Sequence, residues 1–351
     1  MSSEQHSQRA WTRRALGTAV LGSTVLAATA TGAAAQRPNP SPTSCERSAN
    51  GRLHEIRSGR HRVVIAGVAA TLLSWQVDGT ELLLTHPAEE MGEGYQGKTI
   101  LPWPNRIDRG RYSFDGQELQ VPVNEPKRNA ALHGLMNFAE WELVEHARDR
   151  VVLRSLLYPH YGYPFSLAFE IEYAVTGDGV RSTLIARNAG STSAPFGTAT
   201  HGYIAASAGK INSMELELPA STYYRTNDRL IPVGTSPVDG TEYDFRTARR
   251  IGSTTMDTAF TDLTRRRDGT AVVRFGRPGG ENVEMWVDET HDYLQVYTDD
   301  APSAERPQRA RSGVTVEPMT CPPNAFVTGE GVIVLRPGQQ HRGSWGYRVA
   351  E

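Results

Sequence analysis

The stretch VVIAGVAATLLSWQVDGTELLL, residues 63–84, indicates the fold class. Two runs of β-branched and apolar residues, 63–66 and 71–77, lie on either side of a few small residues. Asp78-Gly79 follows, and a third apolar run occupies 81–84. An Asp-Gly pair between two such runs is typical of a tight β-hairpin, because the turn needs residues that tolerate a positive φ angle. We therefore predict antiparallel strands at the start of the folded chain.

The same pattern of short apolar runs separated by turn residues continues to the end of the chain. We expect further strands at 112–114, 118–121, 141–145, 151–157, 166–175, 182–188, 214–218, 271–275, 283–287, 294–298, 332–335 and 344–349. Beyond residue 35 no long segment shows the 3.6-residue period of an amphipathic helix. These features predict an all-β protein, a large antiparallel β-sandwich of stacked sheets. No linker or fixed-period repeat divides residues 53–351, so we expect one domain there.

Composition excludes several classes of protein. The chain has 351 residues, 38% of them hydrophobic, which is enough for a sizeable core. A formal charge of −2 gives no support for a nucleic-acid or anionic-membrane partner. Cys45 and Cys321 are too few for a disulfide framework or a four-cysteine zinc site. Export would permit a disulfide between them, but we expect two unpaired thiols.

Residues 1–35 have the parts of a bacterial signal peptide. Arg13-Arg14 precedes an apolar run of small residues, and Ala33-Ala34-Ala35 provides an A-x-A ending. The paired arginines indicate the twin-arginine type. A membrane anchor is the alternative, although the run is short and rich in Ala, Thr and Gly for a span. We predict cleavage after Ala35, a flexible lead-in over 36–52, and an exported (secreted or cell-envelope) protein.

Two proline-containing segments present a charged side chain. KTILPWPNRI, residues 98–107, is expected to be a rigid loop that presents Arg106, because its prolines cannot donate to a strand ladder. VEPMTCPPNAF, residues 316–326, places Glu317 before a proline, which holds it extended at the end of an apolar strand. Taken alone, an arginine is usually at the surface and a glutamate at a strand end is usually solvated.

Two histidines each precede a glycine. His133 ends the segment NAALH before Gly134, and His201 lies in TATHGY at 198–203. A glycine at this position permits close approach of another backbone segment. Taken alone, either histidine is more often a structural or surface residue than a catalyst.

Together these segments resemble the aldose 1-epimerase (galactose mutarotase) family, in the branch whose arginine loop reads PWPNRI. The similarity covers nearly all of residues 60–349. It is carried, in the family's order, by PWPNRIDRGRYSFDG (102–116), LHG (132–134), GYPF (162–165), His-x-Tyr (201–203), LIPVG (230–234), DTAFTDL (257–263) and EPMTCPPNAF (317–326).

The resemblance implies a β-sandwich of the galactose mutarotase type, with a sugar in a groove across one sheet. It implies that Glu317 is the general base and His201 the general acid. It also implies that Arg106, His133 and Asp257 bind the substrate. The family's usual His-Pro-Tyr is His-Gly-Tyr here, from which we expect a looser backbone beside His201.

The chemistry of anomer exchange fits these residue types. A base takes a proton from the anomeric hydroxyl and an acid gives one to the ring oxygen, so that the ring opens and recloses on its other face. We expect a carboxylate and an imidazolium on opposite sides of the ring, with the imidazolium populated near neutral pH by a neighbouring carboxylate. No metal and no organic cofactor is expected, and the expected partner is a monosaccharide such as galactose or glucose.

Three other functions remain open from the sequence. A glycoside hydrolase would use two carboxylates, for which Glu317 and Asp257 are candidates. A hexose-phosphate epimerase would need a basic cluster, such as the arginines at 265–267. A non-catalytic sugar-binding protein would keep the groove without the acid or base. The preferred aldose and the oligomeric state are not determined by the sequence.

Overall fold

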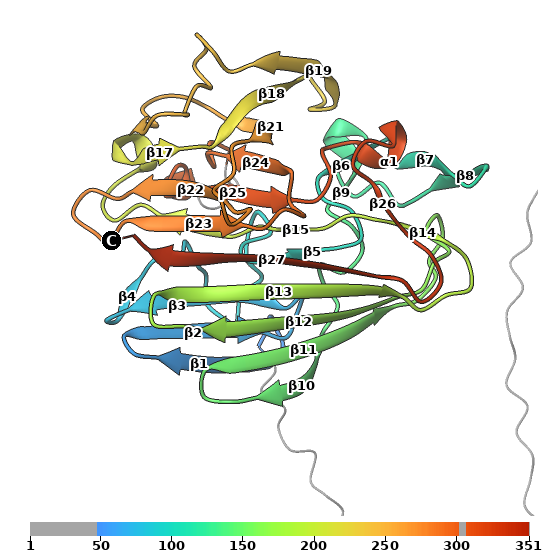
Figure 1. Cartoon of the computed structure of the whole chain (residues 1–351), viewed down its shortest axis with the longest axis horizontal. Helices are drawn as coiled ribbons and strands as arrows, with labels where there is room; N and C mark the ends of the chain where they lie inside the picture. The colour runs from blue at the N-terminus through green and yellow to red at the C-terminus, as the bar shows by residue number, and fades with distance from the viewer. Residues whose placement is uncertain (1–47, 302–306, 351) are drawn as a thin grey trace, which may run out of the picture. The chain divides into compact units, whose positions relative to one another are not determined.

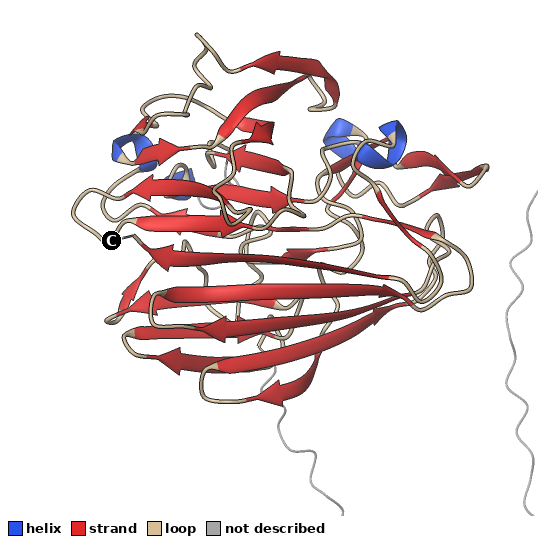
Figure 2. Cartoon of the chain, in the orientation of Figure 1, coloured by secondary structure: helices blue, strands red, loops and turns tan. Residues whose placement is uncertain are grey.

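The computed structural model describes residues 48–301 and 307–350, and it confirms the all-β prediction (Figures 1 and 2). The predicted signal peptide, Cys45 and most of the lead-in lie outside the described residues. Glu46–Glu351 forms one compact unit. Within the described part of the chain, no helix has the length and apolar character needed to cross a membrane. Cys321 is buried and unpaired there.

Two large antiparallel sheets make up the body of the protein. The first has nine strands, in the order β10 (Glu142–His146), β11 (Arg150–Leu157), β12 (Leu167–Val175), β13 (Gly179–Asn188), β27 (Gln340–Val349), β23 (Val283–Val287), β22 (Ala271–Gly276), β17 (Glu215–Glu217) and β20 (Arg249–Arg250). The second has the order β19 (Pro232–Pro237), β18 (Ala220–Thr226), β21 (Asp257–Leu263), β24 (Tyr293–Tyr297), β25 (Gly313–Met319), β15 (Ala199–Thr200) and β5 (Thr99–Ile100), and β16 (Tyr203–Ala205) also pairs with β25.

Smaller sheets and short helices complete the fold. The sheets are the four-stranded sheet β1 (Leu53–Ser58), β2 (His61–Ala66), β3 (Thr71–Val77) and β4 (Thr80–Glu81), and the ribbons β6 (Arg106–Asp108) with β9 (Ala130–Leu132), β7 (Arg111–Phe114) with β8 (Gln117–Gln120), and β14 (Ala194–Phe196) with β26 (Ile333–Leu335). β1 and β2 contact β11 and β12 of the first large sheet. The helices are short: α1 (Ala325–Thr328) and the 3-10 helices η1 (Pro126–Arg128), η2 (Ile211–Ser213) and η3 (Pro307–Arg309).

Apolar side chains of both large sheets meet in one core. Along β12, alternate residues such as Phe169, Ile171 and Tyr173 are buried and belong to it. Val314 and Val316 of β25 belong to the same core. This alternation is what the two-residue period of the sequence predicts. The residue of β25 between Val314 and Val316 therefore faces the opposite side of the sheet.

The first hairpin has the predicted turn. Asp78 and Gly79 both have positive φ angles, of 48° and 81°, and Val77 pairs with Thr80 across the turn. The return strand ends at Glu81, earlier than expected. Beyond it the chain pairs with β16 instead: Leu83 forms an antiparallel bridge with Ile204, and the N–H of Leu84 donates to the Tyr203 carbonyl.

Candidate functional site

Strand register brings Glu317 and His201 together. Glu317 lies inside β25, two residues from its end, and is buried. β15 pairs with β25 at Met319 and β16 pairs with it at Thr315. His201 occupies the interruption between β15 and β16 and therefore lies opposite Glu317. The His201 Nε2 atom is 3.2 Å from Glu317 Oε1.

Hydrogen bonds fix the backbone on both sides of His201. Its N–H donates to the carbonyl of Lys98 (3.0 Å), and its own carbonyl accepts from the N–H of Gly97 (2.9 Å). A Cβ atom at Gly202 would lie 2.4 Å from the Tyr347 hydroxyl oxygen. The glycine therefore makes room for a packed tyrosine.

His133 is held beside His201 by a strained loop. Its φ angle is +61°, and the two imidazole ring centroids are 5.1 Å apart. The backbone N–H of Asn105 donates to His133 Nδ1 (3.3 Å), which assigns the ring proton to Nε2. Gly134 has φ +74°, and a Cβ there would lie 1.9 Å from the Leu101 carbonyl oxygen. The close approach predicted for this glycine is confirmed.

Arg106 is a buried residue of β6 and not the exposed loop residue that a lone arginine suggests. Its guanidinium donates to both carboxylate oxygens of Glu125, from Nε at 2.7 Å and from Nη2 at 3.1 Å. Nη2 also lies 3.7 Å from Asp257 Oδ2. The bidentate pair fixes the guanidinium plane.

The C-terminal motif that contains Glu317 also holds Arg106 in place. Asn324, directly before α1, has a left-handed φ angle of 65°. Its backbone N–H donates to the Arg106 carbonyl (2.7 Å), and its side-chain oxygen accepts from the N–H of Asp108 (2.9 Å). One segment of the chain therefore supplies Glu317 and positions the arginine.

Asp257 is linked to Glu317 through the intervening strand. Gln295 of β24 pairs with Glu317 in the register of β24 and β25. Its side-chain amide donates to Asp257 Oδ1 (2.6 Å). Burial raises the pKa of Asp257, and the charge of Arg106 opposes this shift. The two carboxyl groups thus share one face of the sheet, with an amide between them.

All five residues that the sequence singled out line one cavity of about 400 Å³, within the usual size range of small-molecule sites. The sequence reasoning missed Tyr95, Glu125 and Gln295. Tyr95 follows a glycine-rich segment and packs edge-on against His133, with ring centroids 4.6 Å apart. The remaining lining includes Arg128, Leu132, Leu230, Met256, Tyr297 and Asp300.

Burial changes the protonation that we expected for the acid and base. It lowers the pKa of His201 to about 3. It raises the pKa of Glu317, with the charge of Asp257 adding to the increase and Arg106 opposing it. Both shifts favour a neutral imidazole beside a protonated carboxyl group, and so oppose the resting imidazolium that we expected. Desolvation by burial is the largest cause of both shifts.

The side chains of His201 and Glu317 also lie next to each other and not on opposite sides of a cleft. This arrangement still suits the chemistry, because the anomeric oxygen and the ring oxygen are bonded to the same carbon atom. His133 has a pKa lowered by burial and by the nearby His201 and Arg106, so it remains a neutral donor.

Among the described residues, His133, His201 and Glu317 are a group that could hold a metal ion, with ligand atoms within 4.8 Å of one another. Their protonation does not favour this, because a metal needs deprotonated ligand atoms. Nδ1 of His133 accepts from Asn105, which leaves its proton on Nε2. Burial also favours the protonated form of Glu317. The cluster is better suited to proton transfer.

A family model described as aldose 1-epimerase matches residues 52–348. The chain belongs to the aldose 1-epimerase family. An Escherichia coli K12 protein named YihR, described as uncharacterized, is 32% identical over 294 residues, which covers 84% of this chain and 92% of that protein. The aldose 1-epimerase of the same organism is 27% identical over 325 residues, covering 83% and 92%.

Solved structures of this family share the fold. A Caenorhabditis elegans GalM/aldose epimerase homologue superimposes with a TM-score of 0.75 at 18% identity and covers 86% of this chain and 99% of its own. The galactose 1-epimerase of Lactobacillus acidophilus gives a TM-score of 0.73 at 19% identity, covering 87% and 97%. The predicted galactose mutarotase type of β-sandwich is thus confirmed.

Proposed function

We propose that this protein is an aldose 1-epimerase that interconverts the α and β anomers of free aldoses. The observation that carries the proposal is the contact of 3.2 Å between His201 Nε2 and Glu317 Oε1 inside a cavity that Arg106, His133 and Asp257 also line. Membership of the family supports the reaction class.

In this proposal Glu317 takes the proton from the anomeric hydroxyl and His201 gives one to the ring oxygen. The pair shares one transferable proton. This proton is on the Glu317 carboxyl group in the resting form and on the His201 ring in the carboxylate–imidazolium form. The active form is therefore reached by a transfer along the existing contact, without uptake from solvent. Polar sugar hydroxyls favour this charged form because they replace part of the lost hydration. The two groups exchange roles on reclosure, and each contributes about 10²–10⁴-fold to the rate.

The remaining side chains bind and polarise the sugar. His133 offers its Nε2 proton, and Arg106 can offset negative charge that develops on oxygen, as donors do in an oxyanion site. Asp257, oriented by Gln295, accepts from sugar hydroxyls. Hexoses such as galactose or glucose are the proposed substrates, supported by relatives named aldose 1-epimerase and galactose mutarotase.

The arginines at 265–267 do not support a hexose-phosphate epimerase. Arg265 donates to the backbone carbonyls of Asp288 and His291, and Arg266 pairs with Glu284. None of these arginines lines the cavity that holds Glu317. A phosphate in that cavity would therefore have to be held by other groups.

NMR exchange spectroscopy tests the proposal, with freshly dissolved aldoses, disaccharides and hexose phosphates as substrates. We expect catalysed exchange between the anomers of free aldoses. Release of reducing sugar from a glycoside would support a hydrolase instead. Binding of sugar without accelerated exchange would indicate a non-catalytic binding protein.

We also propose that residues 1–35 export the protein by the twin-arginine route. Fusion of this segment to a folded reporter should direct the reporter across the bacterial membrane, and Arg13→Lys with Arg14→Lys should block it. Translocation that is unaffected by the double substitution would argue against this route.

A further inference from the structure

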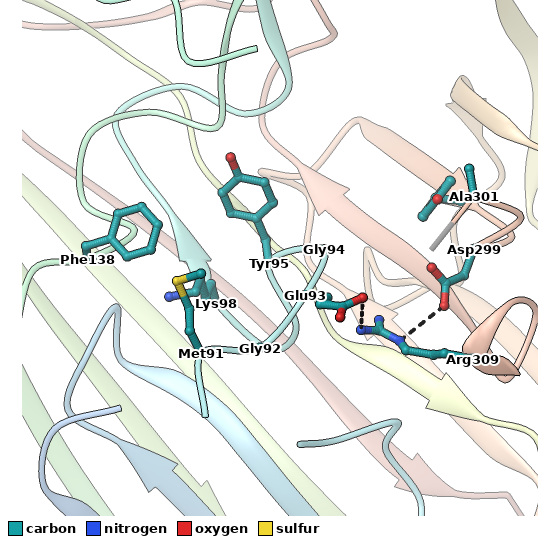
Figure 3. Close-up of a pocket in the computed structure, with 11 residues that line it drawn as sticks. Met91, Gly92, Glu93, Gly94, Tyr95, Lys98, Phe138, Asp299, Ala301 and Arg309 are labelled. Atoms are coloured by element: carbon teal, nitrogen blue, oxygen red, sulfur yellow. Dashed lines mark ion pairs between the residues drawn. The ribbon is translucent and has the colours of Figure 1, made fainter. Parts of the chain in front are cut away.

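A second cavity, of about 390 Å³, adjoins the proposed sugar site (Figure 3). The two cavities share Tyr95 and Tyr297 among their lining residues. Figure 3 shows Tyr95 between two groups of side chains, with Met91, Lys98 and Phe138 on one side and Arg309 with its acidic partners on the other. The proposed mechanism uses none of these side chains. The two cavities therefore meet at Tyr95 and Tyr297.

Lys98 brings a buried positive charge to this cavity. Its side chain is buried, and Nζ donates to the backbone carbonyl of Asn137 at 2.6 Å. Nζ also lies 4.8 Å from the centroid of the Phe138 ring. Among the described residues, no carboxylate lies within ion-pair distance of this ammonium group. An ammonium has three donors, so two remain for a ligand.

The other charges of the cavity are already paired. Arg309 lies 3.7 Å from a carboxylate oxygen of Glu93 and 3.5 Å from one of Asp299. Two carboxylates thus face one guanidinium, whereas Lys98 is the basic side chain among the described lining residues that has no carboxylate within ion-pair distance. A buried charge without a counter-ion is costly. In agreement, burial lowers the pKa of Lys98 to about 8.

We propose that this cavity binds a carboxylate carried by the substrate, with Lys98 as its counter-ion, so that the enzyme favours acidic aldoses of the hexuronic acid class. This inference rests on the proposed function, because it places the substrate's reactive carbon beside Glu317. A carboxylate fits better than a phosphate, since a doubly charged group needs more donors and Arg309 already has two acidic partners.

The test compares galacturonic acid with galactose in both binding and anomer exchange. For the folded wild-type protein we expect kcat/KM and affinity to be about 10- to 100-fold higher for the acid, the range of one charge-assisted hydrogen bond. Lys98→Gln keeps a donor for the Asn137 carbonyl but removes the charge, so the ratio of acid to neutral sugar should fall close to one. Lys98→Arg should retain most of the preference. Lys127→Gln, at an exposed lysine, is the matched control and should retain the wild-type ratio.

The other possible outcomes distinguish a structural role of Lys98, a preference for phosphate, and failure of the proposed function. If Lys98→Gln weakens both sugars equally, Lys98 is structural and the proposal is wrong. A stronger preference for galactose 6-phosphate than for galacturonic acid would overturn the carboxylate assignment. If the acid binds preferentially through Lys98 but neither sugar shows accelerated exchange, the inference stands and the proposed function fails. Equal binding of acid and neutral sugar by the wild-type protein would overturn the inference even if exchange is fast.

Discussion

His201 Nε2 and Glu317 Oε1 are 3.2 Å apart, whereas the other ring nitrogen and the other carboxyl oxygen of this pair have no hydrogen-bond partner among the described residues. A buried polar atom without a partner costs about 1–3 kcal/mol. The fold therefore keeps an unsatisfied polar atom on both the proposed acid and the proposed base.

The burial of Glu317 should make it a destabilising residue above acidic pH. Because its folded pKa is raised above its usual 4.5, the folded state keeps a proton that the unfolded state loses, and stability falls as pH rises through this window. Glu317→Gln removes the effect. We expect the variant to be more stable than the wild type by about 1–2 kcal/mol at pH 7, with a smaller difference near pH 4.

Denaturant unfolding at several pH values measures this difference. Glu89→Gln, at an exposed glutamate, serves as the control and should leave stability unchanged. A Glu317→Gln protein that is less stable than the wild type at pH 7 would contradict the burial argument.

The pH dependence of kcat/KM should lack the inflection of an ordinary histidine. Burial lowers the pKa of His201 to about 3, so lowering the pH through 6.5 should not protonate it in the free enzyme. At alkaline pH the pair should lose its shared proton, and activity should fall. The pKa for this loss is raised because Glu317 is buried. These limits belong to the pair as a whole. Activity that falls with a midpoint near 6.5 on the acid side would show that His201 titrates normally.

Arg106→Lys should impair substrate binding more than folding. Lysine cannot reproduce the two hydrogen bonds to Glu125 while also reaching Asp257. We expect kcat/KM for the preferred sugar to fall about 10- to 100-fold, the equivalent of one or two charge-assisted hydrogen bonds. Arg111→Lys, at an exposed arginine of the neighbouring β7, is the control. Equal kinetics for both variants would show that Arg106 is structural.

Asn324 should affect activity although it does not line the cavity. Alanine in its place loses the hydrogen bond to Asp108 and is strained at a φ angle of 65°. Asn324→Ala should lower stability by about 1–3 kcal/mol and also reduce kcat/KM, because β6 carries Arg106. Asn324→Gly keeps the backbone angle, so it should recover part of the stability but not the hydrogen bond. Full activity in folded Asn324→Ala would exclude this positioning role.

Much of this fold was predictable because strands and tight turns are encoded locally. The Asp78-Gly79 hairpin and the alternation of β12 follow from turn chemistry and a two-residue period. β18 and β19 were missed because most of their residues are only partly buried or exposed, which removes the apolar signal. β19 is the edge strand of its sheet and β18 lies next to it, so their pairing is specified by neighbouring strands.

The candidate site was predictable where a motif carries it and not where contacts build it. Arg106, His133, His201, Asp257 and Glu317 lie in segments that resemble a known family. Their protonation could not be derived from the sequence, because it depends on burial that only the assembled sheets create. Nor could Glu125 be found, since its pairing with Arg106 arises from the path of the loop before η1.

Exchange spectroscopy on Glu317→Gln tests the central claim most directly. Glutamine preserves the shape of the side chain and its place in β25 but cannot take a proton from the anomeric hydroxyl. We predict that the folded variant still binds sugar and that its rate of anomer exchange falls to the uncatalysed rate. Exchange at the wild-type rate in that variant would contradict the assignment of Glu317 as the base.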